Sequence, residues 1–270
     1  MKFSMCADII YQNMDFCEKL ALIKDNGFST VEFWQWQNKD ICGIKSEIQR
    51  LDMNVSAFCI GSNDEKVMSA IGNNMLNSAN LPELKQAVFE SIETAKKLEA
   101  KELIATVGDS IDGISFEKQV ENVYKNIEAV KNIFETEKIT LLIEPINLKE
   151  RPNYLLPNIK SVADIVKNIG CKNVKLLYDI YHQTAENDFS VENLIELLPV
   201  TGHIHIADYP GRHEPGTGNI DYRTVFEELY KNKCKCTIGM EYIPSEDEEK
   251  SFEKLRLSSS KNHRYELTTF

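Results

Sequence analysis

The stretch that decides the fold is TLLIEPIN, from Thr140 to Asn147. It is an apolar run that ends in polar residues, and uninterrupted apolar strands are typical of parallel sheets, in which both faces are buried. Runs of this kind recur along the whole chain. They predict strands over residues 3–7, 30–34, 55–60, 102–107, 140–146, 174–180, 202–207 and 237–242.

Segments with helical spacing lie between these runs. In the clearest, Val88, Ile92, Ala95 and Leu98 recur at the intervals that place them on one face of a helix. Alternating strands and helices predict parallel strands joined by right-handed crossovers. Eight repeats in 270 residues favour an α/β fold that closes into a single (β/α)8 TIM barrel, which typically takes roughly 250 residues.

The barrel is expected to span residues 1–257, with a last outer helix over 246–257 and a C-terminal tail over 258–270. No composition shift marks an internal domain boundary. The longest irregular connection is expected over 62–80, a stretch rich in Asn and Ser that is a candidate lid.

Composition excludes several classes of function. A net charge of −11 argues against a nucleic-acid partner, because such a partner needs a basic face. The longest apolar runs are far shorter than the roughly 20 residues of a membrane span. Seven scattered cysteines and an N-terminus without a signal-peptide pattern indicate free thiols and a cytoplasmic protein.

Polar side chains that could bind a metal end four consecutive strands. These residues are Glu144 and Asn147 on the fifth strand, Asp179 and His182 on the sixth, His203, His205 and Asp208 on the seventh, and Glu241 on the eighth. In a barrel of this type the working residues lie at the carboxyl ends of the strands. We therefore expect the site at that end of the barrel.

The period of a strand sharpens this expectation. His203 and His205 share one face of the seventh strand, while Ile204 and Ile206 share the other. The isoleucines suit packing against outer helices, so the histidines are expected to point into the barrel. His205 can then meet the carboxylates of three neighbouring strands near the barrel axis.

Three carboxylates in a partly buried site repel one another and take up protons, and a divalent cation removes that cost. The expected metal ligands are Glu144, Asp179, His205 and Glu241. Three oxygen donors and one imidazole suit Mn²⁺ or Mg²⁺, with Co²⁺ as a further possibility. Taken alone, Asp179 is more typical of a helix cap and His203 of an interior histidine, but the joint occurrence on four strands favours a metal site.

Four motifs in a fixed order resemble the hydroxypyruvate isomerase family, which is part of the xylose-isomerase-like superfamily of TIM barrels, the sugar isomerases and epimerases. The motifs are LLIEPIN, YDIYH, GHIHIADYPGRHEPGTGNIDY and GMEY. The most specific match is ADYPGRHEPGTGNIDY, which ends at Tyr222. The resemblance is strongest over residues 139–244.

The resemblance implies a metal-dependent enzyme of carbohydrate metabolism that interconverts hydroxypyruvate and tartronate semialdehyde through an enediolate. Its metal ligands are a Glu, an Asp, a Gln or His and a second Glu, which match the four residues above. The two glutamates, Glu144 and Glu241, also serve as the acid/base pair. His182 and Arg212 correspond to the residues that contact substrate, and a guanidinium such as that of Arg212 suits a carboxylate.

Several neighbours of the expected site have two interpretations. Trp34 and Phe58 are either walls of the substrate pocket or plain core. The glycines and prolines around Arg212 predict a stiff loop that presents this residue and His213 at the barrel mouth, although His213 also suits an ordinary surface connection.

Other functions stay open at this point. A 2-oxo-tetronate isomerase or a ketose 3-epimerase of the same superfamily would use the same chemistry on another small sugar acid or sugar. A more distant alternative is an endonuclease IV-like DNA repair enzyme, which needs more ligands on the early strands and a basic groove. A non-catalytic sugar-acid sensor is a third. The outer helices of such barrels often pair subunits, so a homo-oligomer is possible.

Overall fold

Parallel strands close into a barrel within residues 1–260, the part of the chain that the structure, a computed structural model, describes. The strands are β1 (Lys2–Cys6), β2 (Thr30–Phe33), β3 (Asn54–Cys59), β4 (Glu102–Thr106), β5 (Thr140–Glu144), β6 (Val174–Asp179), β7 (Thr201–Ile206) and β8 (Thr237–Met240). Their order around the barrel is their order in the sequence, and β8 pairs with β1. The predicted (β/α)8 TIM barrel is therefore confirmed.

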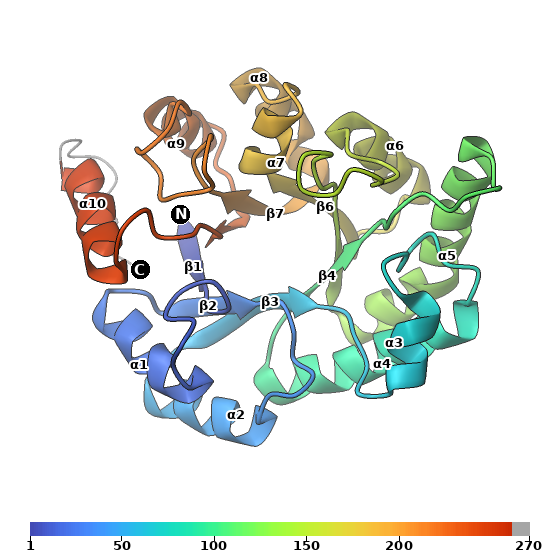
Figure 1. Cartoon of the computed structure of the whole chain (residues 1–270), viewed down its shortest axis with the longest axis horizontal. Coiled ribbons are helices and arrows are strands. Elements are labelled where there is room, and N and C mark those ends of the chain that lie inside the picture. The colour runs from blue at the N-terminus through green and yellow to red at the C-terminus, as the bar shows by residue number, and fades with distance from the viewer. Residues whose placement is uncertain (261–270) are drawn as a thin grey trace.

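Helices surround the ring of strands (Figure 1). They are α1 (Phe16–Asp25), α2 (Ile41–Arg50), α3 (Glu65–Ile71), α4 (Leu81–Leu98), α5 (Phe116–Glu137), α6 (Ile159–Ile169), α7 (Ile180–Ala185), α8 (Val191–Leu197), α9 (Tyr222–Lys231) and α10 (Glu248–Ser260). The face of α4 that the sequence predicts to be apolar, which includes Val88, Ile92 and Ala95, is buried. Burial of such faces against the strands forms the main core.

The structure differs from the sequence-based expectation at one connection and at the end of the last helix. The connection over 62–80 contains the short helix α3, whose first turn is capped by Asp64 through a 2.8 Å bond from Lys66 N. The last helix runs to Ser260, beyond the expected end at residue 257. The remainder of the expected tail, residues 261–270, lies outside the described residues.

The interior of the barrel is divided into an apolar and a polar part. Ala57, Ile104, Leu142 and Leu177, from β3 to β6, form a small apolar cluster of their own, separate from the main core. The buried polar residues include Glu32 of β2 and both histidines of β7. Ile204 and Ile206 of β7 belong to the main core, so the expected alternation of this strand is confirmed.

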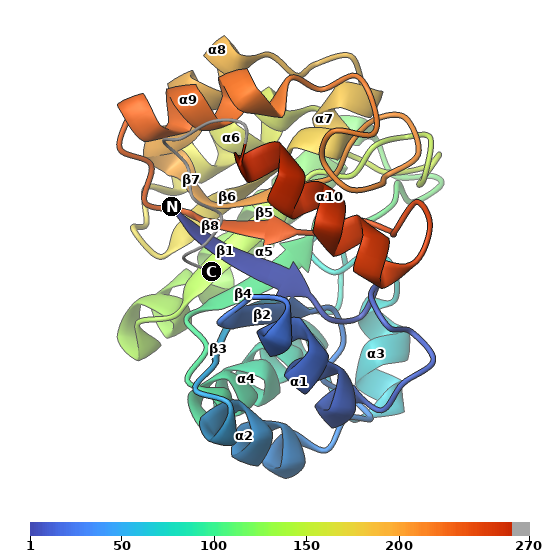
Figure 2. The same cartoon turned by 90° about the vertical axis from the view of Figure 1, so that its left-hand side faces the viewer.

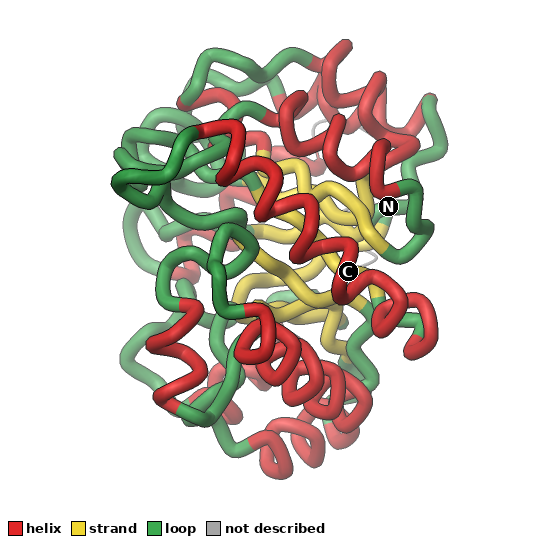
Figure 3. The backbone as a smooth tube through the Cα atoms, turned by 90° about the vertical axis from the view of Figure 1, so that its right-hand side faces the viewer, coloured by secondary structure: helices red, strands yellow, loops and turns green. Residues whose placement is uncertain are grey.

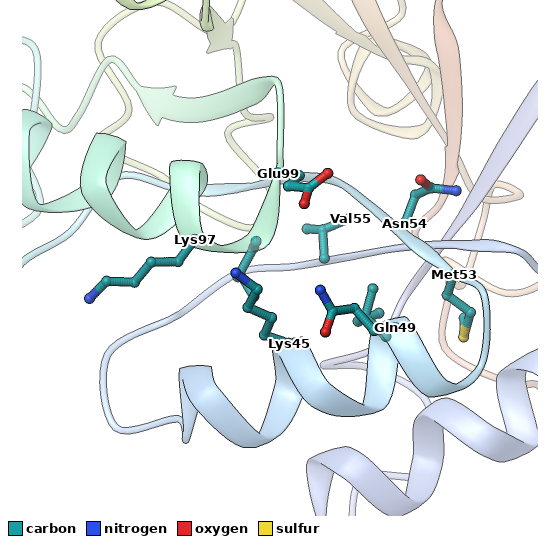
Figure 4. Close-up of a pocket in the computed structure, with 9 residues that line it drawn as sticks. Lys45, Gln49, Met53, Asn54, Val55, Lys97 and Glu99 are labelled. Carbon is teal, nitrogen blue, oxygen red and sulfur yellow. The ribbon is translucent and has the colours of Figure 1, made fainter.

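The carboxyl ends of the strands point to one end of the barrel, as the arrowheads of β1 and β8 show (Figure 2). Long loops gather on that side (Figure 3). A pocket lies at the other end, beside the start of β3, and its charged lining residues are Lys45, Lys97 and Glu99 (Figure 4). All seven cysteines are free thiols. In the described part of the chain, no helix has the length and apolar character needed to cross a membrane.

Candidate metal centre

The four expected metal ligands meet at the carboxyl end of the barrel. Glu144 and Asp179 are the last residues of β5 and β6, His205 lies on β7, and Glu241 directly follows β8. Each side chain is buried, and each offers one donor atom within 4.8 Å of those of the other three. The structure thus brings together all four residues that the sequence singled out.

His205 carries the observation that tests whether a cation fits this cluster. Its Nδ1 lies 3.4 Å from Glu144 Oε1 and 3.4 Å from Glu241 Oε2. No hydrogen bond reaches either ring nitrogen among the described residues, although the ring is buried. A buried nitrogen without a hydrogen bond is costly. A divalent ion bound by Nδ1 and the surrounding carboxylates would satisfy it, so these residues fit such an ion.

The pKa values of His205 and Glu241 reflect the charges that surround them in this cluster. Burial alone would lower the pKa of His205, but the charges of Glu241 and Glu32 raise it well above its ordinary value. Burial alone would raise the pKa of Glu241, but the charges of His205 and Arg212 hold it far below the ordinary value. The opposite shifts of these two groups show that the side chains of the cluster are strongly coupled through their charges.

Both oxygens of Glu241 are held by neighbours from distant parts of the chain. The indole Nε1 of Trp34 donates to Oε1 at 2.5 Å, and Nη2 of Arg212 donates to Oε2 at 2.5 Å. Trp34, which follows β2, is 37% exposed, and its bond to Glu241 places it beside the cluster. Phe58 is fully buried and stacks on Phe33, so it belongs to the core.

Asp179 caps a helix and also lies in the cluster of four candidate ligands. Its Oδ1 accepts a 3.0 Å bond from the backbone N of His182 and caps α7. Its Oδ2 lies 3.6 Å from the ring Nε2 of His182. The carboxylate is therefore fixed by the helix that follows it and still contributes an oxygen to the cluster.

His182 is oriented by Asn147, the polar residue that follows β5. The two side chains meet at 2.6 Å, between Asn147 Nδ2 and His182 Nδ1. Asn147 Oδ1 accepts the backbone N of Glu150 at 2.9 Å, which assigns the amide nitrogen to the histidine. Nδ1 of His182 is then an acceptor, and the neutral ring carries its proton on Nε2, beside Asp179.

Arg212 lies on the loop after β7 and points into the cluster. Its Nη1 donates to Glu150 Oε2 at 2.9 Å, and its guanidinium lies 5.4 Å from the centre of the Tyr181 ring. The buried carboxylate of Asp208 shapes this loop by accepting the backbone N–H groups of Tyr209, Gly216 and Ile220. The loop thus presents the arginine beside the candidate ligands.

The remaining histidines of the region have other contacts. Nδ1 of His213 lies 2.8 Å from the backbone oxygen of Ile243, which ties the loops after β7 and β8 together. His203 is fully buried in the barrel, with Nδ1 2.8 Å from Glu102 and Nε2 3.1 Å from Glu32. This arrangement fits the interior-histidine interpretation of His203.

Comparison with known proteins decides the family. A family model described as a xylose isomerase-like TIM barrel matches residues 20–258. The chain belongs to this family. The predicted resemblance to the xylose-isomerase-like superfamily is therefore confirmed.

Proteins that are similar to this xylose isomerase-like chain carry several names. Hydroxypyruvate isomerase of Escherichia coli (strain K12) is 27% identical over 248 residues, which cover 90% of this chain and 94% of that protein. The 2-oxo-tetronate isomerase of Cupriavidus necator is 35% identical over 121 residues, 44% of this chain and 46% of that protein. The solved structure of AP endonuclease, family 2 from Brucella melitensis has a TM-score of 0.85 at 23% identity, with 95% of this chain and 98% of that chain covered. At this identity, the last likeness shows the fold alone.

Three neighbours of the site were not predicted from the sequence of this xylose isomerase-like barrel. Glu32, Glu150 and Tyr181 lie against residues of the site. Trp34, for which the sequence left a pocket wall and plain core open, also lies against it. For Glu32 a signal exists, because a carboxylate in the middle of the apolar run over 30–34 needs a partner when it is buried. For Glu150 and Tyr181, which lie in a loop and a short helix, we find no comparable signal.

Proposed function

We propose that this protein is a metal-dependent isomerase that interconverts hydroxypyruvate and tartronate semialdehyde. The observation that carries the proposal is the set of four buried donors, Glu144, Asp179, His205 and Glu241, within 4.8 Å of one another. Arg212 beside this set supports an acidic substrate, since a guanidinium can bind two oxygens of a carboxylate. The hydroxypyruvate isomerase of E. coli, similar over 94% of its length, supports the same activity.

The metal-ligand roles are part of this proposal, and Mn²⁺ or Mg²⁺ suits the donors best, with Co²⁺ as a further candidate. When bound, such an ion polarises the substrate carbonyl and stabilises the negative charge that develops on its oxygen. Substrate and product contain the same atoms. Their interconversion moves one hydrogen between adjacent carbons and one between the oxygens that they carry.

The residues of the chain divide this work. We assign proton transfer at the two carbons to Glu144 and Glu241: one carboxylate takes the proton from one carbon, and the other, in its protonated form, delivers a proton to the neighbouring carbon. Proton exchange between the two groups through solvent restores both. His182, with its proton on Nε2, donates a hydrogen bond to a substrate oxygen. Arg212 binds the carboxylate and so sets which end of the substrate lies at the two glutamates.

A second candidate is a 2-oxo-tetronate isomerase. The observation that favours it is the 35% identity over 121 residues to the enzyme of that name from C. necator. A substrate of this class is also a small acid, so Arg212 and the four donors would act on it in the same way. The two candidates differ in how large a substrate the mouth of the barrel admits.

Metal analysis of the purified protein, followed by substrate assays, tests the proposal. We expect about one divalent ion per chain and turnover of hydroxypyruvate that a chelator abolishes and added Mn²⁺ or Mg²⁺ restores. Asp179→Asn is the matched control for the loss of one charged donor, because asparagine keeps the size of the aspartate side chain and removes its charge. Metal-dependent turnover of 2-oxo-tetronates or ketoses without hydroxypyruvate would select another substrate. Turnover that a chelator leaves unchanged would reject the metal centre.

A further inference from the structure

A second polar cluster lies inside the barrel, next to the candidate ligands. It consists of Glu32, His203 and His205, and all three side chains are buried. The interior of a TIM barrel is normally filled by bulky apolar side chains. A buried carboxylate is costly unless it is paired, so Glu32 needs a physical reason to be there.

Glu32 has close partners on both oxygens. Its Oε1 lies 3.0 Å from His205 Nε2, and its Oε2 lies 3.1 Å from His203 Nε2. Oε2 also accepts hydrogen bonds from the hydroxyls of Ser4 and Ser56. The two serines hold the carboxylate from β1 and β3, while the two imidazoles contact it from β7.

The consequence concerns the two nitrogens of His205. A neutral imidazole has one nitrogen with a proton and one with a lone pair. Nδ1 faces Glu144 and Glu241 in the candidate metal centre, whereas Nε2 faces Glu32. For Nδ1 to bind a cation, the proton must lie on Nε2. Among the described residues, Glu32 is the carboxylate within ion-pair distance of that nitrogen.

We propose that Glu32 is a positioning residue of the metal centre: it holds the proton of His205 on Nε2 and orients the ring so that Nδ1 binds the ion. This inference depends on the proposed metal-dependent function. Carboxylates that contact the outer nitrogen of a metal-bound histidine raise metal affinity, and their loss typically costs about 10–100-fold in affinity or activity. In the structure, His205 Nε2 and Glu32 Oε1 lie 3.0 Å apart without the alignment of a hydrogen bond.

Gly239 of β8 supplies an independent observation. It pairs with His205 on one side and with Ser4 on the other. A Cβ at this position would lie 2.1 Å from Glu32 Oε1 and 2.7 Å from His205 Cδ2. The missing side chain therefore leaves the space in which the carboxylate and the imidazole meet, and an alanine there would separate them or displace both.

The test measures the Kd of Mn²⁺ by titration calorimetry for the wild type, Glu32→Gln and Glu102→Gln. We expect Glu32→Gln to raise the Kd about 10–100-fold. Glu102→Gln, which removes the other carboxylate beside His203, should leave the Kd within about twofold, because it does not touch His205. Circular dichroism of each variant without metal checks that the barrel is folded.

A second readout separates positioning from general stability. In ¹⁵N spectra of the protein without metal, recorded at a pH at which the ring is neutral, the resonance lost in His205→Gln identifies His205. Its proton should lie on Nε2 in the wild type and be shared between both nitrogens in Glu32→Gln. If Glu32→Gln fails to fold, Gly239→Ala replaces it, and it should also raise the Kd.

The outcomes distinguish this inference from the proposed function. A wild type that binds neither Mn²⁺ nor Mg²⁺ would reject both. A wild type that binds Mn²⁺, together with an unchanged Kd in Glu32→Gln or in a folded Gly239→Ala, would overturn the role of Glu32 and leave the metal centre intact. Two ions per chain, one of them lost with Glu32→Gln, would also overturn it, since Glu32 would then be a ligand.

Discussion

The carboxylates of Glu144 and Glu241 lie at equal distances, 3.4 Å, from Nδ1 of His205 but in different surroundings. Glu241 is fixed through both oxygens by Trp34 and Arg212. Glu144 ends β5 directly before a proline, and Tyr154 bonds to its backbone oxygen at 2.6 Å. Each glutamate is therefore held in position by the fold. A general acid or base must be held in this way relative to the carbon at which it acts.

Replacement of either glutamate by glutamine tests this pair. Glu144→Gln and Glu241→Gln keep the side-chain size but remove the charge and the proton acceptor. We expect each variant to lose about 10²–10⁴-fold in kcat with hydroxypyruvate, the usual contribution of a general acid or base. Steady-state kinetics with saturating Mn²⁺ measures the loss, and a melting curve without metal checks the fold.

Glu128→Gln on the outer helix α5 is the matched control for that pair. Its partly exposed carboxylate pairs with Lys131 at 2.7 Å on the same helix and has no contact with the site residues, so the variant should keep wild-type turnover. Full activity in Glu144→Gln or Glu241→Gln would remove that residue from the mechanism.

Arg212 is expected to set the preference for acidic substrates. Because charge-assisted bonds contribute roughly 1.5–3 kcal/mol, Arg212→Ala should raise KM for hydroxypyruvate by about 10–100-fold. A neutral ketose, which has no carboxylate, should show a much smaller change if it is turned over at all. Kinetics with both substrates checks this, and equal effects on both would contradict a contact with the carboxylate.

At the scale of elements, all the barrel strands could be predicted from the sequence. Each is a short apolar run between helical segments, and burial on both faces requires such a run. The strands end slightly earlier than the runs do, because the chain leaves the sheet before its hydrophobic residues stop. The short helix α3 was missed, since one to two turns give too little periodicity to detect.

A candidate ligand could be predicted where its position follows from the sequence of its own strand. Asp179 and His205 stand at the ends of neighbouring apolar runs, and strands in sequence order bring such ends together. The contacts of Glu32 and Trp34 were not predictable, because they depend on how β2 faces β7 and β8 across the barrel. The stagger of a closed barrel sets that geometry, and no local pattern encodes it.

Glu214 gives a prediction about the loop elements. It is fully buried and accepts bonds from Ser245 N at 2.9 Å and Ser245 Oγ at 2.6 Å, while Lys254 of α10 lies 3.1 Å away. Burial alone would raise its pKa, but these partners lower it below 4.5. We expect Glu214→Gln to lower the free energy of unfolding at pH 7 by about 1–3 kcal/mol.

The sign of the pH dependence follows from the lowered pKa. A carboxylate of this kind stabilises the fold above the unfolded pKa near 4.5, and this contribution is lost as the pH falls through the folded value. The difference between wild type and Glu214→Gln should therefore be largest at neutral pH and shrink below 4.5. Urea unfolding from pH 7 to pH 3 measures it. Glu246→Gln, at an exposed neighbour of Lys254, is the control, and a pH-independent difference would contradict the assignment.

At the scale of the whole molecule, the candidate metal centre brings together side chains from half of the barrel strands. Its four donors come from β5, β6, β7 and the residue after β8, so one ion would link strands that otherwise meet through backbone pairing. The chain also carries a net charge of −11, and three of its carboxylates meet at this centre. Loss of the ion would return their mutual repulsion to the folded state.

Removal of the ion should therefore lower the melting temperature of the whole barrel. A ligand that binds the folded state alone stabilises it by about 2.7 kcal/mol at 100 times its Kd. For a chain of this size that corresponds to roughly 5–10 °C in Tm. Scanning calorimetry with chelator and with increasing Mn²⁺ measures the shift. In Asp179→Asn, where one charged donor of the cluster is lost, the same Mn²⁺ concentrations should shift Tm much less. An equal shift in wild type and Asp179→Asn would mean that Mn²⁺ stabilises the protein elsewhere, since the four donors would then not act together on one ion.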